Sequence, residues 1–248
     1  MNANIVIAAL FSILVSGGAS AYQTGNFFIR FGAAHVSPDD SSDGIAIPAL
    51  GLSPIPGTQA EVATETQLGL TFNYMFSKAL GVELLASTPF SHKITADLAA
   101  AGISGVADVA AGEAKHLPPT VSLVFYPLAS NDSSIQPYLG LGLNFTEFFQ
   151  EQVNQELEDG TPVITDALGT DLGVSTLPMK LDLEDSWGLA AQIGVDLKLD
   201  EKWHLNASVR WIDIDTEATF SAAGADIISV NNVSIDPYVY QLNLGYKF

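Results

Sequence analysis

The chain ends on DPYVYQLNLGYKF, residues 236–248, and this stretch is the clearest indication of its fold. Every second residue is aromatic or apolar, in the order Tyr238, Tyr240, Leu242, Leu244, Tyr246 and Phe248. The residues between them become polar or small toward the end, as at Gln241, Asn243 and Lys247. Successive side chains of a strand point to opposite sides, so this period of two predicts a β-strand with one apolar face.

The same alternation recurs through the rest of the chain. Together with 233–248, it predicts eight strands, the others being residues 26–36, 64–76, 80–95, 116–128, 135–148, 182–199 and 203–219. The connections alternate between long segments (37–63, 97–112, 150–181 and 220–232) and short ones (77–79, 129–134 and 200–202). This layout is typical of an all-β fold, the eight-stranded antiparallel transmembrane β-barrel, with long extracellular loops and short periplasmic turns.

The chemistry of the two strand faces agrees with a membrane barrel. One face is apolar and suits lipid, whereas the other carries Gly, Ser, Asn and Gln and suits a small lumen. Aromatic residues at the strand ends, such as Tyr74, Trp187 and Trp211, suit the interfacial girdles. The alternative is a soluble eight-stranded barrel or sandwich whose apolar faces pack on each other.

Composition excludes several functions. The 248 residues include 28 Asp and Glu against 9 Lys and Arg, a formal charge of −19, so nucleic acid is not an expected partner. The absence of cysteine excludes thiolate metal sites and disulfides. Beyond the N-terminus, no apolar run approaches the ~20 residues of a transmembrane helix.

Residues 1–21 have the features of a signal peptide. Ile5 to Val15 form an apolar core, and Ala19, Ser20 and Ala21 offer a small-x-small cleavage site. The n-region carries no Lys or Arg, and the alternative is a buried N-terminal helix or membrane anchor. We therefore expect export of a single barrel domain, residues 22–248.

Several strings resemble the outer membrane protein W (OmpW) family, and they fall on all eight predicted strands. They include FFIRFGAAHVSP, TQLGLTFNYMFSKALGVELLASTPFSHKI, HLPPTVSLVFYP, QPYLGLGLNFTEFF, LEDSWGLAAQIGVDLKLDEKWHLNASVRWIDIDT and the terminal DPYVYQLNLGYKF. The resemblance implies a barrel in the outer membrane of a Gram-negative cell, usually a monomer, in contact with membrane lipid and lipopolysaccharide. It also implies that Tyr246 and Phe248 form the signal read by the outer-membrane assembly machinery.

The resemblance further implies passage of small hydrophobic molecules. These enter a narrow apolar funnel from outside and leave sideways through the barrel wall. Leu85 lies in the string GVELLA, whose leucine contributes to the constriction of the funnel in the family. Pro89 follows closely, and Pro118 and Pro119 interrupt the next strand. Proline cannot donate to a β-ladder, so these positions are candidates for a lateral opening. The alternative for Leu85 is simple filling of the barrel interior.

Four charged residues are predicted to face the lumen: Arg30, Glu83, Asp196 and Arg210. Arg210 departs from the family pattern, in which an aromatic residue often stands there. A lumenal arginine needs a partner, for which Glu83, Asp196 and Asp213 are candidates. We expect these residues, with Lys198, to form an interior network that stabilises the barrel and makes the lumen more polar than a hydrocarbon route prefers.

Other chemistry has weaker support in the sequence. The acidic segment from Glu147 to Asp185 could bridge to lipopolysaccharide through Ca²⁺ or Mg²⁺, but it lacks EF-hand spacing, and a solvated loop is the simpler interpretation. His35, His92 and His116 lie near the predicted outer rim, but none has the spacing of a metal site. A serine two residues away from one of these histidines lies too far from its ring for the hydrogen bond that would activate the serine as a nucleophile.

The sequence therefore predicts a barrel without enzymatic activity, metal or cofactor. Its expected function is passive passage of small hydrophobic solutes. The alternative is a structural or receptor barrel with a closed lumen, which binds partners such as a colicin or phage through its loops.

Overall fold

A computed structural model describes residues 22–48, 51, 54–97, 108–129, 133–159 and 178–248. The proposed signal peptide therefore lies outside the described residues. The first strands are β1 (Phe27–Ser37), β2 (Gln59–Val62), β3 (Glu65–Met75), β4 (Leu80–Ser87), β5 (Phe90–Asp97), β6 (Val109–Leu117) and β7 (Thr120–Phe125). They are followed by β8 (Ile135–Val153), β9 (Lys180–Leu183), β10 (Ser186–Lys198), β11 (Trp203–Ile212), β12 (Asp215–Ala222), β13 (Ala225–Ser234) and β14 (Tyr238–Lys247).

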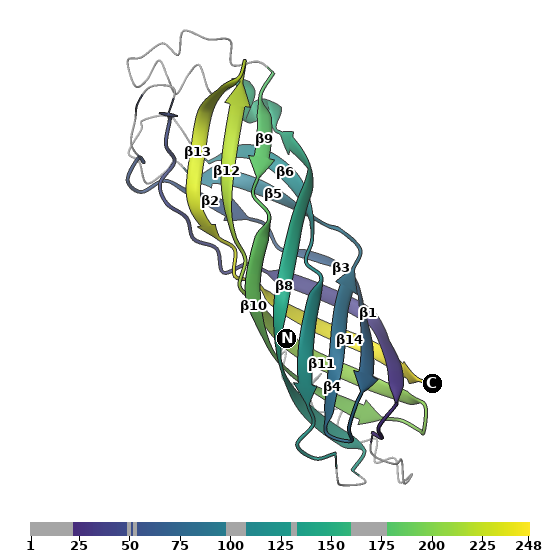
Figure 1. The fold of residues 1–248 in the computed structure, drawn as a ribbon. Helices are drawn as coiled ribbons and strands as arrows, with labels where there is room; N and C mark the ends of the chain where they lie inside the picture. Colours follow the sequence, from purple (N-terminus) through teal and green to yellow (C-terminus); the bar gives the residue numbers. More distant parts are fainter. Residues whose placement is uncertain (1–21, 49–50, 52–53, 98–107, 130–132, 160–177) are drawn as a thin grey trace, which may run out of the picture.

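Eight of these strands close into the predicted antiparallel barrel (Figure 1). Their order around the wall is β1, β3, β4, β7, β8, β10, β11 and β14, and β14 pairs back onto β1 from Phe28↔Lys247 to Ser37↔Tyr238. Closure leaves no free sheet edge in the barrel. A bilayer requires this, because lipid cannot hydrogen-bond the backbone groups of an open edge. Among the described residues, no helix is long and apolar enough to cross a membrane.

The two faces of the barrel strands are sorted as the alternation predicts. On β8, Leu139, Leu141 and Leu143 are 54, 73 and 61% exposed, whereas Tyr138 and Asn144, on the opposite face of the strand, are buried. Large apolar side chains are likewise exposed on all the other barrel strands. A continuous apolar outer wall of this kind is stable only against lipid.

The segments predicted as long connections contain further strands. β8 continues past the barrel, where its far end pairs with β6, while β6 pairs with β5 and β5 with β2. β9, β12 and β13 form a separate three-stranded sheet. We call these six strands, with the far end of β8, the outer extension. Residues 220–232, predicted as a long connection between two barrel strands, mostly belong to β12 and β13, so this connection is itself largely β-structure.

One segment closes the wall of the outer extension between β13 and β2. This segment, residues 38–48, is called the strap. Ala46 and Ser229 exchange two backbone hydrogen bonds of 2.9 and 3.0 Å. On the other side, Ala60 N donates to Ser42 Oγ over 2.9 Å. Ile45 and Ile47 of the strap are buried in the apolar core of the extension.

Candidate functional site

The structure brings the four predicted lumen charges into one network. Arg30 Nη1 donates to Glu83 Oε2 over 2.6 Å, and Arg30 Nη2 donates to Asp196 Oδ2 over 2.7 Å. Arg210 Nη2 donates to Glu83 Oε1. All four side chains are at most 1% exposed. Two guanidinium groups are thus compensated by two carboxylates, as a buried network requires.

Polar residues that the sequence analysis did not single out complete this network. Tyr22 donates its hydroxyl to Asp196 over 2.7 Å, and Arg30 Nη2 donates to the hydroxyl oxygen of Tyr126 over 2.6 Å. Gln192 donates to Glu83 over 2.9 Å and accepts from Arg210 over 2.8 Å. Alternation places Gln192 in the lumen, but Tyr22 precedes the first strand and carries no such signal.

Aromatic rings also contact the network. The guanidinium of Arg30 lies 4.9 Å from the ring centroids of both Phe28 and Tyr138. Gly194 makes room for the Tyr138 ring, because a Cβ there would clash with it. Charges and rings thus fill this level of the lumen, which we call the plug.

Two other residues considered for the network lie apart from its centre. The Nζ of Lys198 is 5.1 Å from the ring centroid of Tyr22, on the margin of the plug. Asp213 is not the partner of Arg210. It lies instead beyond the end of β11, near Asp215 and Asp236.

Packed apolar side chains fill the molecule on the outer side of the plug, and this apolar region is called the chamber. Leu85 is only 3% exposed and follows Glu83 on the inward face of β4. Ala190 and Ile212, at the matching level of β10 and β11, belong to the apolar core that continues into the outer extension. Leu85 therefore lies where the plug gives way to the chamber.

The prolines align across one boundary of the barrel wall. Ladder pairs between β4 and β7 end at Leu85↔Thr120, and those between β5 and β6 begin at Phe90↔His116. Pro89 interrupts one side of this gap, and Pro118 and Pro119 interrupt the other. We call this gap the seam. On its far side, Phe145 N still donates to Pro119 O over 3.1 Å, so β8 holds β7 while the ladder toward β4 is broken.

Two of the three predicted rim histidines meet just outside the seam. The rings of His92 and His116 stack with centroids 4.8 Å apart and planes 6° apart. Burial lowers the pKa of His92, and it lowers the pKa of His116 to about 3, with a smaller contribution from His92. Both rings are therefore neutral near pH 7. His35 lies elsewhere, on the outer wall, with Nδ1 2.8 Å from Thr66 Oγ1.

The remaining predicted features occupy the ends of the barrel. Phe248 is 66% exposed, and its ring lies 5.5 Å from that of Phe27 and 5.0 Å from that of Tyr246. These rings contribute to an aromatic girdle at the end with short turns. Much of the acidic segment, residues 160–177, lies outside the described residues.

Comparison with known proteins agrees with this architecture. Residues 23–248 match the OmpW family. The chain is 42% identical to outer membrane protein W of Vibrio cholerae serotype O1, with 100% of both chains covered. It is 38% identical to outer membrane protein W of Escherichia coli strain K12, with 98% of this chain and 99% of the other covered.

A solved structure gives the same result. The crystal structure of outer membrane protein OprG from Pseudomonas aeruginosa superposes with a TM-score of 0.75 at 38% identity, covering 93% of this chain and 98% of the other. The full-length match and the shared closed barrel place the protein in the outer membrane. The chain belongs to the OmpW family of outer-membrane β-barrels.

Proposed function

We propose that this barrel passes small, mostly apolar molecules across the outer membrane, through the apolar chamber and out sideways at the seam. The observation that carries this proposal is the ladder gap between Leu85↔Thr120 and Phe90↔His116. It opens the hydrogen-bonded wall next to the chamber and on the outer side of the plug. Membership of the OmpW family supports the same sideways exit.

The plug makes a route straight through the lumen costly. An apolar solute moving past Arg30 and Glu83 would separate ion pairs that are almost fully buried. Breaking such a pair costs about 3–5 kcal/mol, because it leaves an uncompensated charge out of water. A solute that turns into the bilayer above the plug leaves these pairs intact.

The seam lowers the cost of the lateral step. A ladder hydrogen bond contributes about 0.5–1.5 kcal/mol net, and its groups must find other partners if it breaks in lipid. Pro89, Pro118 and Pro119 lie at the gap and have no backbone N–H to donate. Opening the wall there therefore breaks fewer ladder hydrogen bonds than elsewhere. Leu85 provides an apolar surface at the floor of the chamber beside this gap.

A second candidate is a structural or receptor barrel with a closed lumen. The observation favouring it is that the plug is fully charge-compensated and that Ile45 and Ile47 of the strap pack into the chamber core. In that case the outer extension would present loops to partners such as a colicin or phage, and no solute would pass.

Uptake measurements separate the two candidates. Cells lacking the protein would receive the native chain, Leu85→Arg or the matched control Leu85→Met, and uptake of a labelled medium-chain hydrophobic compound would be followed. We expect native and Leu85→Met barrels to speed uptake and Leu85→Arg to abolish the gain at equal levels of folded barrel. Equal uptake in all cells would refute the conduit and favour the closed barrel.

A further inference from the structure

Several buried polar atoms around Leu85 have no hydrogen-bond partner within the described part of the chain. They are Nε and Nη1 of Arg210, Nε2 of Gln241 and Oγ of Ser87. Arg210 and Gln241 are 1 and 3% exposed, so neither side chain reaches bulk solvent. Buried polar atoms are almost always paired in proteins, so a group of unpaired ones in one region needs a physical explanation.

The donors of Arg210 lie on the inward side of Leu85. Nη2 of Arg210 crosses the lumen from β11 and donates to Glu83 and Gln192. Glu83 and Leu85 are two residues apart on the inward face of β4, so the guanidinium lies at the foot of Leu85. The cross-strand neighbour of Arg210 is Val239, which belongs to the chamber. The unpaired Nε and Nη1 therefore lie at the floor of the chamber.

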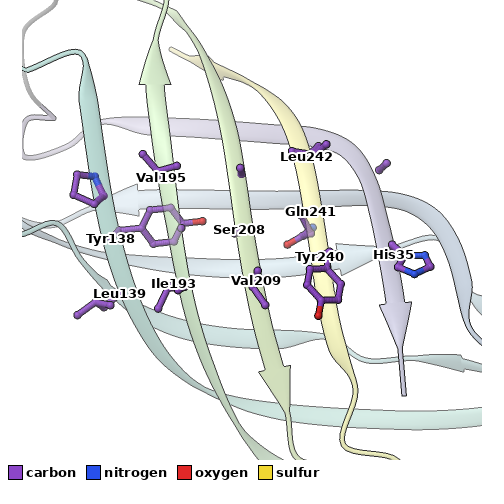
Figure 2. A pocket seen from close by; sticks show the side chains of 14 residues that line it. His35, Tyr138, Leu139, Ile193, Val195, Ser208, Val209, Tyr240, Gln241 and Leu242 are labelled. Carbon is purple, nitrogen blue, oxygen red and sulfur yellow. The ribbon is translucent and has the colours of Figure 1, made fainter. Parts of the chain in front are cut away.

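The amide of Gln241 lies on the outward side of Leu85. Gln241 stands on β14 between two lipid-facing neighbours, so its own side chain points into the lumen (Figure 2). A Cβ on Gly69 of β3 would lie 2.8 Å from Gln241 Nε2, so the amide rests over that glycine. Gly69 is paired with Ser87, the next residue after Leu85 on the inward face of β4.

These polar atoms lie next to the seam. Ser87 is the last residue of β4, and Pro89 follows it at the gap in the wall. Leu85 thus offers an apolar surface with unpaired donors on both its inward and outward sides. A molecule whose apolar body packs against Leu85 would have these donors within reach of a polar end.

The charge balance of the plug restricts the polar end to an uncharged group. Arg30 and Arg210 are already compensated by Glu83 and Asp196. A neutral oxygen acceptor would accept hydrogen bonds from the remaining donors without adding charge. A carboxylate would bring a further negative charge out of water, which is costly without a cation of its own.

We propose that Arg210 and Gln241 bind the head of a solute that joins an apolar body to one uncharged oxygen acceptor, such as the carbonyl of a ketone. This inference rests on the proposed conduit and names its substrate class. The body lies against Leu85, beside the seam. A plain alkane would leave the buried donors unpaired, and a site with donors of this kind discriminates against a ligand that lacks the acceptor.

The test compares uptake of a labelled medium-chain methyl ketone with uptake of the labelled alkane of the same length. Cells lacking the protein would receive the native chain, Gln241→Leu, Arg210→Lys or Gln59→Leu. Gln241→Leu removes the amide donor, and Arg210→Lys keeps the charge beside Glu83 but loses the guanidinium donors. Gln59→Leu is the matched control, because this exposed glutamine lies on β2, in the outer extension.

Uptake would be measured at limiting solute concentration, and heat-dependent gel migration would establish equal amounts of folded barrel. We expect the native barrel to take up the ketone faster than the alkane. Gln241→Leu should lower the ratio of ketone to alkane uptake about fivefold and Arg210→Lys about tenfold, because hydrogen bonds to the head are lost. Gln59→Leu should keep the native ratio.

The outcomes separate this inference from the conduit itself. If both solutes enter through the barrel but Gln241→Leu and Arg210→Lys keep the native ratio, the head-group site is refuted and the conduit stands. Faster barrel-dependent uptake of the carboxylate of the same length than of the ketone would overturn the uncharged head. If the barrel speeds the uptake of neither solute, the conduit is refuted, and this inference with it.

Discussion

Arg30 and Glu83 form an ion pair of 2.6 Å across the lumen, although their strands, β1 and β4, are separated in the wall by β3. Glu83 also accepts a hydrogen bond from Arg210 on β11. The Glu83 carboxylate thus links β1, β4 and β11. No two of these strands are neighbours in the barrel wall. The plug fixes the barrel cross-section from within, independently of the ladders.

Glu83→Gln should strongly destabilise the barrel. The change leaves two buried guanidinium groups short of a negative charge, and removing one partner from a buried pair costs about 3–5 kcal/mol. The free energy of unfolding in urea, followed by gel migration in lipid vesicles, would measure it. Glu61→Gln, at an exposed acid on β2, should leave the midpoint unchanged. Equal midpoints for the two variants would contradict a structural plug.

Restoring donors at the seam should slow uptake. In Pro89→Ala with Pro119→Ala, two new N–H groups allow the gap between β4 and β7 to pair, so opening must break additional hydrogen bonds. We expect uptake of a hydrophobic compound to fall about fivefold. Pro137→Ala is the control, because that proline lies in an uninterrupted part of the β8 ladder. Uptake by the double variant at the native rate would speak against exit at this seam.

Locking the strap should close the chamber from outside. Ala46 and Ser229 form a hydrogen-bonded bridge, and such pairs have Cα atoms about 5.5 Å apart, within disulfide range. The native chain has no cysteine, so Ala46→Cys with Ser229→Cys forms a single cross-link. We expect oxidation to stop uptake and reductant to restore it.

The control for this lock is a disulfide that leaves the strap unrestrained. Ala222 and Ala225 pair across the turn between β12 and β13, so a cross-link between cysteines there restrains only that turn. Uptake through the control barrel should be the same under oxidising and reducing conditions. If the oxidised Ala46–Ser229 lock also left uptake unchanged, the strap would be a fixed part of the wall.

The stacked histidines should make the outer extension sensitive to acid. Burial lowers the pKa of His116 to about 3 and also lowers that of His92, whereas the unfolded chain protonates near the ordinary value of 6.5. Between pH 6.5 and pH 3 the unfolded chain therefore binds more protons than the folded barrel. The free energy of unfolding is retained in full above pH 6.5 and decreases as the pH falls toward 3.

Substituting one ring tests this linkage. His116→Phe keeps an aromatic ring in the stack but removes a group that protonates on unfolding, so the unfolding midpoint should depend less on pH across this range. Urea titrations at pH 7 and pH 4.5 would measure the difference. A variant with the same pH dependence as the native barrel would show that other groups control acid stability.

The barrel and the inward position of its charges could be predicted from the amino-acid pattern. A period of two over eight segments fixes which side chains meet lipid, because a slip of one residue would expose the whole polar face. Alternation therefore placed Arg30, Glu83, Asp196 and Arg210 in the lumen, and proline chemistry marked the interruptions at Pro89, Pro118 and Pro119. The cleavable leader, residues 1–21, stays a prediction.

Which of these residues meet became clear only from the closed barrel. The partners of Arg30 come from β4 and β10, and local patterning carries no information about contacts between distant strands of a closed wall. β2, β13 and most of β6 were missed because their segments, outside the membrane, lack a lipid-facing run of large apolar residues. The alignment of the prolines into one seam depends on strand register, which is set only when the barrel closes.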